Sequence, residues 1–495
     1  MTHPTPSALG LPRATRIPLW HALIDAIESY RDTVDGLSVS PPLDAPEIRR
    51  IAESFTFAAP RNPLQVIEDL VPQLTRYQVH TPHPCYFGLF NPAPSTMSIA
   101  ADALVAALNP QLAAWSHSPL ASEIELHLVR SLAEKFSIPR DQADGVLTSG
   151  GAEANQTALV AALTHRWPEI HNSGLRALTE EPVFYVSAEA HHSFVKAARA
   201  SGLGAHAVRE IPVTDRLQMD PAALRSALER DRAAGSAPFL VVATAGTTGA
   251  GALDPLPELA RIAQQHNLWF HVDAAWGGAA ALVPELRPLL AGIEHADSIT
   301  FDAHKFLSVS MGAGIFLTRH PDILSRSFAT ATAYMPKEAE RMHATDPFSH
   351  SLQWSRRFIG LKLFLSLAVA GWDGYADTIR HQTAMGDRLR GRLIENGWHI
   401  VNATPLPLVC FTMDGWTLGD CQHIANAVIE SGQAWISTIQ VGPHQQPALR
   451  ACITNYRTEP EHLETLIAAV DRERALHNTS HPINQRGKRM EAVTP

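Results

Sequence analysis

Short apolar runs alternate with stretches of helical periodicity along the middle of the chain. This alternation occurs at least five times between residues 145 and 318, and the apolar runs end in turns or polar residues. Such runs predict buried strands, and the amphipathic stretches between them predict crossover helices. The pattern therefore predicts an α/β unit with a largely parallel sheet, whose strands begin near residues 145, 183, 239, 268, 297 and 314.

The pattern is weaker on both sides of this region. Residues 1–16 show little periodicity and are expected to form a flexible leader, whereas apolar residues recur at helical spacing from about Pro18 to Tyr30. A long helix is expected over residues 351–375. We divide the chain into an N-terminal helical arm with a loop segment (1–95), a large domain (96–375), a small C-terminal α/β domain (376–472) and a disordered tail (473–495).

Composition narrows the kind of protein. The chain has 495 residues, 45% of them hydrophobic, which is enough for a large core. A formal charge of −9 without strong local runs argues against nucleic acid or an anionic membrane as a main partner, and no apolar stretch is long enough to span a bilayer. No two cysteines have zinc-knuckle or redox spacing, so a cytoplasmic location is expected; they are Cys85, Cys410, Cys421 and Cys452.

Two polar residues stand at the ends of predicted buried strands. Lys305 follows the apolar run that starts at Asp297, and Asp273 ends the run LWFHVD. A lysine in this position is costly unless it is paired, neutral or covalently used. The pair fits pyridoxal phosphate, which a lysine holds as a Schiff base while a carboxylate pairs with the pyridinium nitrogen. A snorkelling surface lysine is the alternative interpretation of Lys305.

The stretches Asp297–Lys305 and His271–Gly278 resemble motifs of the group II pyridoxal-phosphate-dependent amino-acid decarboxylases, and the resemblance covers roughly residues 80–460. It implies fold type I of the PLP-dependent transferases, in which a large domain with a mostly parallel mixed sheet precedes a small C-terminal α/β domain. It also implies a homodimer in which the N-terminal arm packs on the partner subunit.

The turn GVLTSGGAEAN, at residues 145–155, joins a predicted strand to a predicted helix. Free backbone N–H groups at a helix N-terminus bind anions, although an ordinary strand–helix connection has the same pattern. The family has its phosphate loop here, so the resemblance assigns the backbone of Gly151 and Ala152 to the phosphate, with Ser149 as a further candidate. It assigns His191 to stacking on the cofactor ring, and the matching motifs place these further residues at the cofactor: Thr248, Asp273, Ala275, His304 and Lys305.

The segment His83–Ser95 is rich in aromatic residues and proline and is expected to be stiff and non-helical. It resembles the substrate-pocket segment of the family, which implies that Leu89, Phe90 and Asn91 face the substrate side chain. Arg450 is a candidate for orienting the substrate carboxylate, and a plain surface arginine is an equal alternative.

The substrate preference leans slightly to an apolar or aromatic side chain, because Leu89, Phe90 and Trp115 are expected near the pocket. Asn91, His117 and His192 leave room for a polar side chain. The adjacent His191 and His192 are potential metal ligands, but no third ligand has suitable spacing, so no metal site is expected.

The resemblance implies decarboxylation of an L-amino acid to the amine and CO2 through a Lys305 Schiff base and a quinonoid intermediate. In the family a tyrosine on a mobile loop returns the proton to Cα. The loop is expected at residues 331–351, where Phe348 (or Pro347, in a register shifted by one) replaces the tyrosine, and phenylalanine cannot donate a proton. Family members with phenylalanine here are associated with reaction with O2, which gives an aldehyde, ammonia, CO2 and hydrogen peroxide. The alternative proton donors are His350, Tyr334 and the loop of the partner subunit.

Two other classes stay open. One is another fold type I enzyme, such as an aminotransferase or C–S lyase, and the spread of the resemblance over the loop and linker helix argues against it. The other is a non-catalytic cofactor-binding protein, and the presence of both Lys305 and Asp273 argues against that.

Several further polar residues are expected to be structural. Asp254 and Pro255 are expected to cap the helix at residues 256–265. Glu123 and Glu125 are expected at a helix start, and Arg356 and Arg357 are expected to pair with acids.

Overall fold

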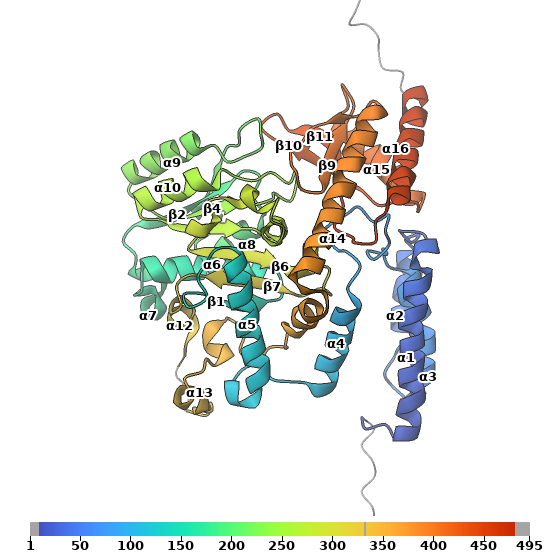
Figure 1. Cartoon of the computed structure of the whole chain (residues 1–495), viewed down its shortest axis with the longest axis horizontal. Coiled ribbons are helices and arrows are strands. Elements are labelled where there is room, and N and C mark those ends of the chain that lie inside the picture. Colours follow the sequence, from blue (N-terminus) through green and yellow to red (C-terminus); the bar gives the residue numbers. More distant parts are fainter. Residues whose placement is uncertain (1–8, 331–332, 481–495) are drawn as a thin grey trace, which may run out of the picture.

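The computed structural model describes residues 9–330 and 333–480, and its centre is a seven-stranded sheet (Figure 1). The strand order is β1-β7-β6-β5-β4-β2-β3. Strands β2 to β6 pair in parallel, whereas β7 runs antiparallel to both β1 and β6. The predicted mostly parallel mixed sheet is thus confirmed; its strands are β1 (Asp144–Thr148), β2 (Glu181–Ser187), β3 (Val208–Ile211), β4 (Ser236–Thr244), β5 (Trp269–Asp273), β6 (Ser298–Asp302) and β7 (Gly314–Thr318).

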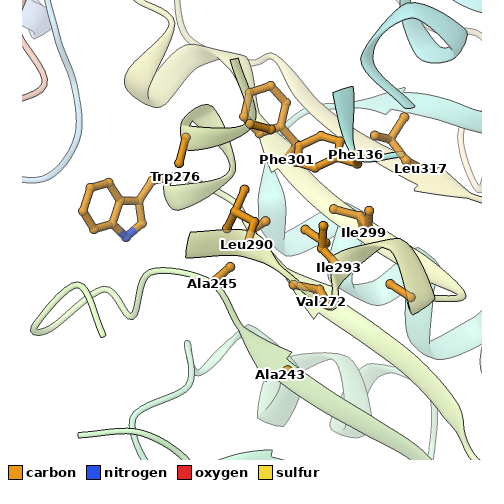
Figure 2. Packing of buried hydrophobic residues seen from close by; sticks show 14 of the residues in the cluster. Phe136, Ala243, Ala245, Val272, Trp276, Leu290, Ile293, Ile299, Phe301 and Leu317 are labelled. Carbon is orange, nitrogen blue, oxygen red and sulfur yellow. The ribbon is translucent and has the colours of Figure 1, made fainter. Parts of the chain in front are cut away.

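Helices pack on both faces of this sheet because successive strand residues point to opposite faces. In β5, Trp269 belongs to an apolar cluster with residues of α6 and α8, whereas Phe270 and Val272 belong to a second cluster on the other face. Figure 2 shows part of that second cluster, in which the rings of Phe136 and Phe301 meet edge to face at 5.8 Å. The covering helices are α5 (Pro119–Lys135), α6 (Gly151–Arg166), α8 (Ser193–Ala200), α9 (Pro221–Ala233), α10 (Leu256–His266) and α12 (Ile323–Phe328).

A smaller sheet with the strand order β10-β11-β9-β8 follows in the sequence. The helix α14 (Leu361–Glu395), which is kinked at Gly371, leads from the large sheet to this one. Two helices, α15 (Leu418–Glu430) and α16 (Pro460–Ser480), complete this part of the chain. The strands are β8 (His399–Ile400), β9 (Leu408–Thr412), β10 (Ser437–Val441) and β11 (Gln446–Cys452).

The first helices stand together at one side of the molecule (Figure 1). No residue of α1 (Arg13–Thr33) is buried, and α1 contacts α3 (Pro63–Arg76). The short α2 (Ala45–Glu53) lies between them in sequence, and α4 (Thr96–Leu108) packs on α14. Among the described residues no helix combines the length and apolarity needed to cross a membrane.

The structure corrects several predicted boundaries. Helix α1 begins at Arg13, so residues 13–16 are helical; residues 1–8 lie outside the described part of the chain. The predicted tail is helical up to Ser480, because His477 turns inward to pair with Asp420 at 3.0 Å and to contact the Trp416 ring; residues 481–495 are not described. The apolar run from Val183 predicts a strand that ends at His191, whereas strand β2 ends at Ser187, four residues earlier.

Two further corrections have a clear physical cause. Helix α14 begins at Leu361 and not near residue 351, because the preceding chain is drawn inward: the Gly360 N–H donates to Glu125 Oε1, and Arg356 pairs with the same carboxylate. Asp254 does not cap α10. Its two oxygens accept the backbone N–H groups of Met219 and Thr244, so it links the segment before α9 to the end of β4 instead.

The predicted loop at residues 331–351 contains two short helical turns within its described part. These are α13 (Glu338–Arg341) and a 3-10 turn at Pro347–His350, and residues 331–332 are not described. The next residues lie against the start of α6, because Gln353 Nε2 donates a hydrogen bond to Glu153 Oε1.

Candidate active site

Lys305 lies on α11 (Ala303–Phe306), a single helical turn that directly follows β6. Its side chain is 21% exposed, and Nζ lies 3.0 Å from Oδ2 of Asp302, the last residue of β6. Asp302 is buried, and its other oxygen, Oδ1, has no hydrogen-bond partner among the described residues. Lys305 is therefore a partly buried, paired lysine and not a snorkelling surface lysine.

Asp273 is the last residue of β5, the strand next to β6, and is only 4% exposed. Its Oδ2 accepts a hydrogen bond from Asn155 Nδ2 at 2.8 Å, and its Oδ1 accepts one from the Ala275 N–H at 3.1 Å. Because β5 and β6 are parallel neighbours, Asp273 and Lys305 both lie at the carboxyl edge of the sheet, where open α/β sheets bind ligands.

The glycine turn that precedes α6 lies at the same edge of the sheet. Helix α6 begins at Gly151, and a Cβ atom added to Gly151 would lie 2.8 Å from Asp302 Oδ2 and 3.4 Å from the Ala275 side chain. The backbone at the start of α6 therefore comes closer to the site than a larger residue would allow. Ser149 differs, since its N–H and its hydroxyl both donate to Glu153 Oε2, at 2.8 and 2.7 Å.

The two histidines of the predicted site have different environments. His191 lies between β2 and α8, with its Nδ1 accepting the Ser193 N–H at 3.2 Å. Partial desolvation lowers the pKa of His191, and the Lys305 charge lowers it further against the opposing effect of Asp273. His304 is buried, which lowers its pKa, and its Nδ1 accepts the Ala313 N–H at 3.2 Å. Both imidazoles are thus favoured in the neutral form.

Arg450, on β11, reaches the site from the small sheet. Only 3% of it is exposed, so the surface-arginine alternative is wrong. Its Nε donates to the Thr248 carbonyl at 3.0 Å and its Nη1 to the Gly88 carbonyl at 3.1 Å. Its Nη2 has no hydrogen-bond partner in the described structure. The side chain therefore joins three distant segments and keeps one donor available.

The Phe90 ring lies close to both Arg450 and Lys305. Its ring centre is 4.9 Å from the Arg450 guanidinium carbon, 5.8 Å from Lys305 Nζ and 4.8 Å from the Trp276 ring. The other two predicted pocket residues are placed differently: Leu89 is 55% exposed, and Asn91 Nδ2 contacts Met311 Sδ at 3.0 Å. Of the three, Phe90 is the one that the structure brings to Lys305.

Phe348 lies in the 3-10 turn at the β1 side of the sheet. Its N–H donates to the Ala113 carbonyl at 3.1 Å, and its ring packs on Trp354 at 4.9 Å. The Tyr334 ring stacks on the same Trp354 at 6.3 Å, and His350 Nε2 lies 3.4 Å from Asp144 Oδ2. These described contacts tie Phe348 to Ala113 and Trp354 and do not include Lys305.

A mixed sheet with a lysine and a carboxylate at the ends of adjacent central strands, followed by a small C-terminal sheet, defines the class of fold type I pyridoxal-phosphate enzymes. The model of the family described as "Pyridoxal-dependent decarboxylase conserved domain" matches residues 48–414, and the chain belongs to this family. It is thus a carboxy-lyase that uses pyridoxal phosphate.

Three similar proteins span most of the chain. Aromatic-L-amino-acid decarboxylase of Bacillus atrophaeus is 29% identical over 90% of this chain and 92% of its own length. The crystal structure of Oryza sativa TDC with PLP and tryptamine has a TM-score of 0.86 and 25% identity, and covers 96% of this chain and 100% of that one. The crystal structure of Rhodiola rosea 4-hydroxyphenylacetaldehyde synthase has a TM-score of 0.83 and 25% identity, and covers 94% of this chain and 99% of that one.

The residues at the sheet edge fit the cofactor. A buried carboxylate at Asp273, an amine at Lys305 and a glycine backbone at the start of a 16-residue helix are the donor and acceptor types that a pyridinium, an aldehyde and a phosphate require. The structure adds two residues that the sequence interpretation did not assign. Asp302 could have been found from its spacing of three to Lys305 on one turn, whereas Asn155 gave no signal beyond its place in the glycine-turn stretch.

Proposed function

We propose that this protein decarboxylates an L-amino acid with an aromatic or apolar side chain to the corresponding amine and CO2. The observation that carries the proposal is the arrangement of Lys305 and Asp273 at adjacent strand ends, with the Phe90 ring in contact with both Lys305 and Arg450. Arg450 offers a buried cationic donor for a carboxylate, and Phe90 with Trp276 offers an apolar aromatic surface.

Each proposed role follows from the position of the residue. Lys305 attaches the cofactor through Nζ, and the backbone of Gly151 and Ala152 at the start of α6 binds its phosphate. Asp273 holds a proton on the pyridine nitrogen by a charge-assisted hydrogen bond. His191 packs against the ring as a neutral imidazole, and Thr248, Ala275 and His304 complete the surroundings, whereas Ser149 is engaged by Glu153.

The bound cofactor supplies an electron sink for the bonding electrons that CO2 leaves behind at Cα. The protein decides which bond breaks, because the bond perpendicular to the ring is the one that is weakened. We assign this choice to Arg450, whose Nη2 donor fixes the position of the substrate carboxylate. The reaction ends with the transfer of a proton to Cα. The proposed proton donors are His350, Tyr334 and a loop of the partner subunit.

A second candidate function rests on Phe348. Its ring packs on Trp354 and has no proton to give, so Cα stays unprotonated long enough to react with O2. The reaction would then convert the amino acid, O2 and water into an aldehyde, CO2, ammonia and hydrogen peroxide. The similarity to an aldehyde synthase supports keeping this candidate.

We further propose a homodimer. Helix α1 exposes four apolar side chains at helical spacing, which a partner subunit would cover: Ile17, Trp20, Ile24 and Ile27. Light scattering of the purified protein tests this, and a monomer that retains full activity would refute it. A cytoplasmic location is supported by the four cysteines, all of which are buried and free of disulfides.

The deciding experiment is a panel of L-amino acids with cofactor-loaded protein, in which CO2, amine, aldehyde and dissolved oxygen are followed together. The proposed function requires CO2 with equimolar amine and no oxygen uptake. Aldehyde with oxygen uptake would replace it by the second candidate. Binding of pyridoxal phosphate without CO2 from any amino acid would refute both.

A further inference from the structure

A row of buried polar side chains stands behind Asp273 on one face of β5 and β6. Trp269, His271 and Asp273 alternate along β5 and therefore share a face, and in the parallel register His271 lies opposite Ser298 of β6. Asn155 reaches this face from α6. All of these side chains are at most 4% exposed, so each polar atom needs a protein partner.

The hydrogen bonds in this row form one chain. Trp269 Nε1 donates to Ser298 Oγ at 2.8 Å, and Ser298 Oγ lies 2.8 Å from His271 Nδ1. His271 Nε2 lies 3.3 Å from Asn155 Oδ1 and also 3.3 Å from the Thr300 hydroxyl. Asn155 Nδ2 then donates to Asp273 Oδ2 at 2.8 Å and to Ser193 Oγ at 2.9 Å.

The donor-to-acceptor direction of this chain of hydrogen bonds is fixed at both ends. An ionised carboxylate only accepts hydrogen bonds, so the Asn155 atom facing Asp273 is the amide nitrogen and its oxygen faces His271. His271 must then carry its proton on Nε2 and accept on Nδ1 from the Ser298 hydroxyl. The indole N–H of Trp269 can only donate, which agrees with this direction at the far end. Burial lowers the pKa of His271 to about 4, which keeps the imidazole neutral, as this arrangement requires.

We propose that this Trp269–Ser298–His271–Asn155 chain is a positioning relay that holds the Asp273 carboxylate in place and aimed at the ring nitrogen of the cofactor. Along the relay each group donates a hydrogen bond to the next group on the way to the carboxylate, and successive hydrogen bonds of one direction polarise each other. Asn155 occupies Oδ2, and the Ala275 N–H fixes Oδ1, so the carboxylate cannot rotate away. The inference rests on the proposed function, because it assigns Asp273 to the pyridine nitrogen.

The test compares the affinity for pyridoxal phosphate with that for its 1-deaza analogue, which lacks the ring nitrogen. Removing a hydrogen bond to a buried charge by Asn155→Ala should weaken pyridoxal phosphate binding by roughly tenfold or more. Ser298→Ala, two links further away, should weaken it by about threefold. Both variants should bind the analogue within about twofold of the wild type, because no ring nitrogen depends on Asp273. Affinities are measured on cofactor-depleted protein by tryptophan fluorescence.

Matched variants separate the relay from general damage to the core. Ser298→Thr keeps the hydroxyl and His271→Gln keeps a donor toward Asn155, so both should bind more tightly than Ser298→Ala and His271→Phe. Ser366→Ala removes a buried hydroxyl that bonds Ser95 and takes no part in the relay, so it should leave the affinity unchanged. If Asn155→Ala does not fold, the comparison of Ser298→Ala with Ser298→Thr tests the relay by itself.

The relay is overturned if the Ser298→Ala variant behaves like Ser366→Ala, or if the affinity for the analogue falls as much as that for pyridoxal phosphate. A protein that shows the predicted order of affinities but releases no CO2 from any amino acid would refute the proposed function and leave the relay standing. The two failures are thus distinguishable.

Discussion

Lys305 Nζ and Asp302 Oδ2 form an ion pair of 3.0 Å at the carboxyl end of β6, beside the first residue of α6. Nζ can attack the cofactor aldehyde only as a free amine, so this pair has to open before the cofactor is attached. We expect Asp302→Asn to accelerate attachment of the cofactor by roughly three- to tenfold, because the interaction free energy of a partly exposed ion pair no longer has to be overcome. Stopped-flow absorbance after mixing with pyridoxal phosphate measures the rate.

The matched control for this prediction is Asp322→Asn, which removes an exposed carboxylate that pairs with Arg326 at 3.3 Å. That variant should attach the cofactor at the wild-type rate. A slower rate in Asp302→Asn would mean that the carboxylate assists attachment and does not restrain it.

Arg450 should matter more for the substrate carboxylate than for the rest of the substrate. Arg450→Met removes the free Nη2 donor and leaves an apolar stem of similar length. We expect kcat/KM to fall by roughly a hundredfold or more, because a charge-assisted contact to the carboxylate is lost. The inhibition constant of the amine product, which has no carboxylate, should change by less than threefold. If binding of the amine weakened as much as kcat/KM falls for the substrate, the role of Arg450 would be to hold the three chain segments together.

The sequence predicted the parts of the site that lie near each other along the chain. The strands before Asp273 and Lys305 were recognisable from their apolar runs, and parallel neighbours necessarily end at one edge. Arg450 was undecided, because its burial depends on carbonyl groups 202 and 362 residues away. The start of α14 was missed for the same reason: apolar periodicity continues through residues 351–360, while the Glu125 carboxylate, more than 200 residues earlier, holds them out of the helix.

That carboxylate gives a prediction about stability. The side chains of Arg356 and Glu125 are each 4% exposed and are paired at 2.6 Å, whereas Arg357 pairs with Asp102 at the surface, where it is 51% exposed. Removing one partner of a buried pair leaves an uncompensated charge, so Arg356→Met should lower the free energy of unfolding by about 3–5 kcal/mol. Arg357→Met should lower it by about 0–1 kcal/mol. Urea unfolding of both variants makes the comparison, and similar losses would show that Glu125 gains water or another partner.

His271 should make the folded protein sensitive to acid. Burial lowers the pKa of His271 from 6.5 to about 4. Between pH 6.5 and pH 4 the unfolded chain therefore binds a proton at His271, whereas the folded protein does not. Stability contributed by neutral His271 is present above pH 6.5 and is lost as the pH falls toward 4. Relative to His271→Gln, the wild type should lose about 2 kcal/mol between pH 6.5 and pH 5. His295→Gln, at an exposed site, should run parallel to the wild type in the same urea titrations.

Phe348 decides between the two candidate products if the loop carries the proton donor. Phe348→Tyr places a hydroxyl on a ring that packs against Trp354 and should return a proton to Cα before O2 reacts. If the wild type forms aldehyde, as the second candidate requires, we expect the fraction of aldehyde in the product and the oxygen consumed per CO2 to fall in this variant. Phe348→Leu, which also lacks a donor, should keep the wild-type ratio. A wild type that forms aldehyde and a tyrosine variant that forms the same fraction would show that residue 348 does not control protonation, and would leave the partner-subunit loop and His350 as the groups to test.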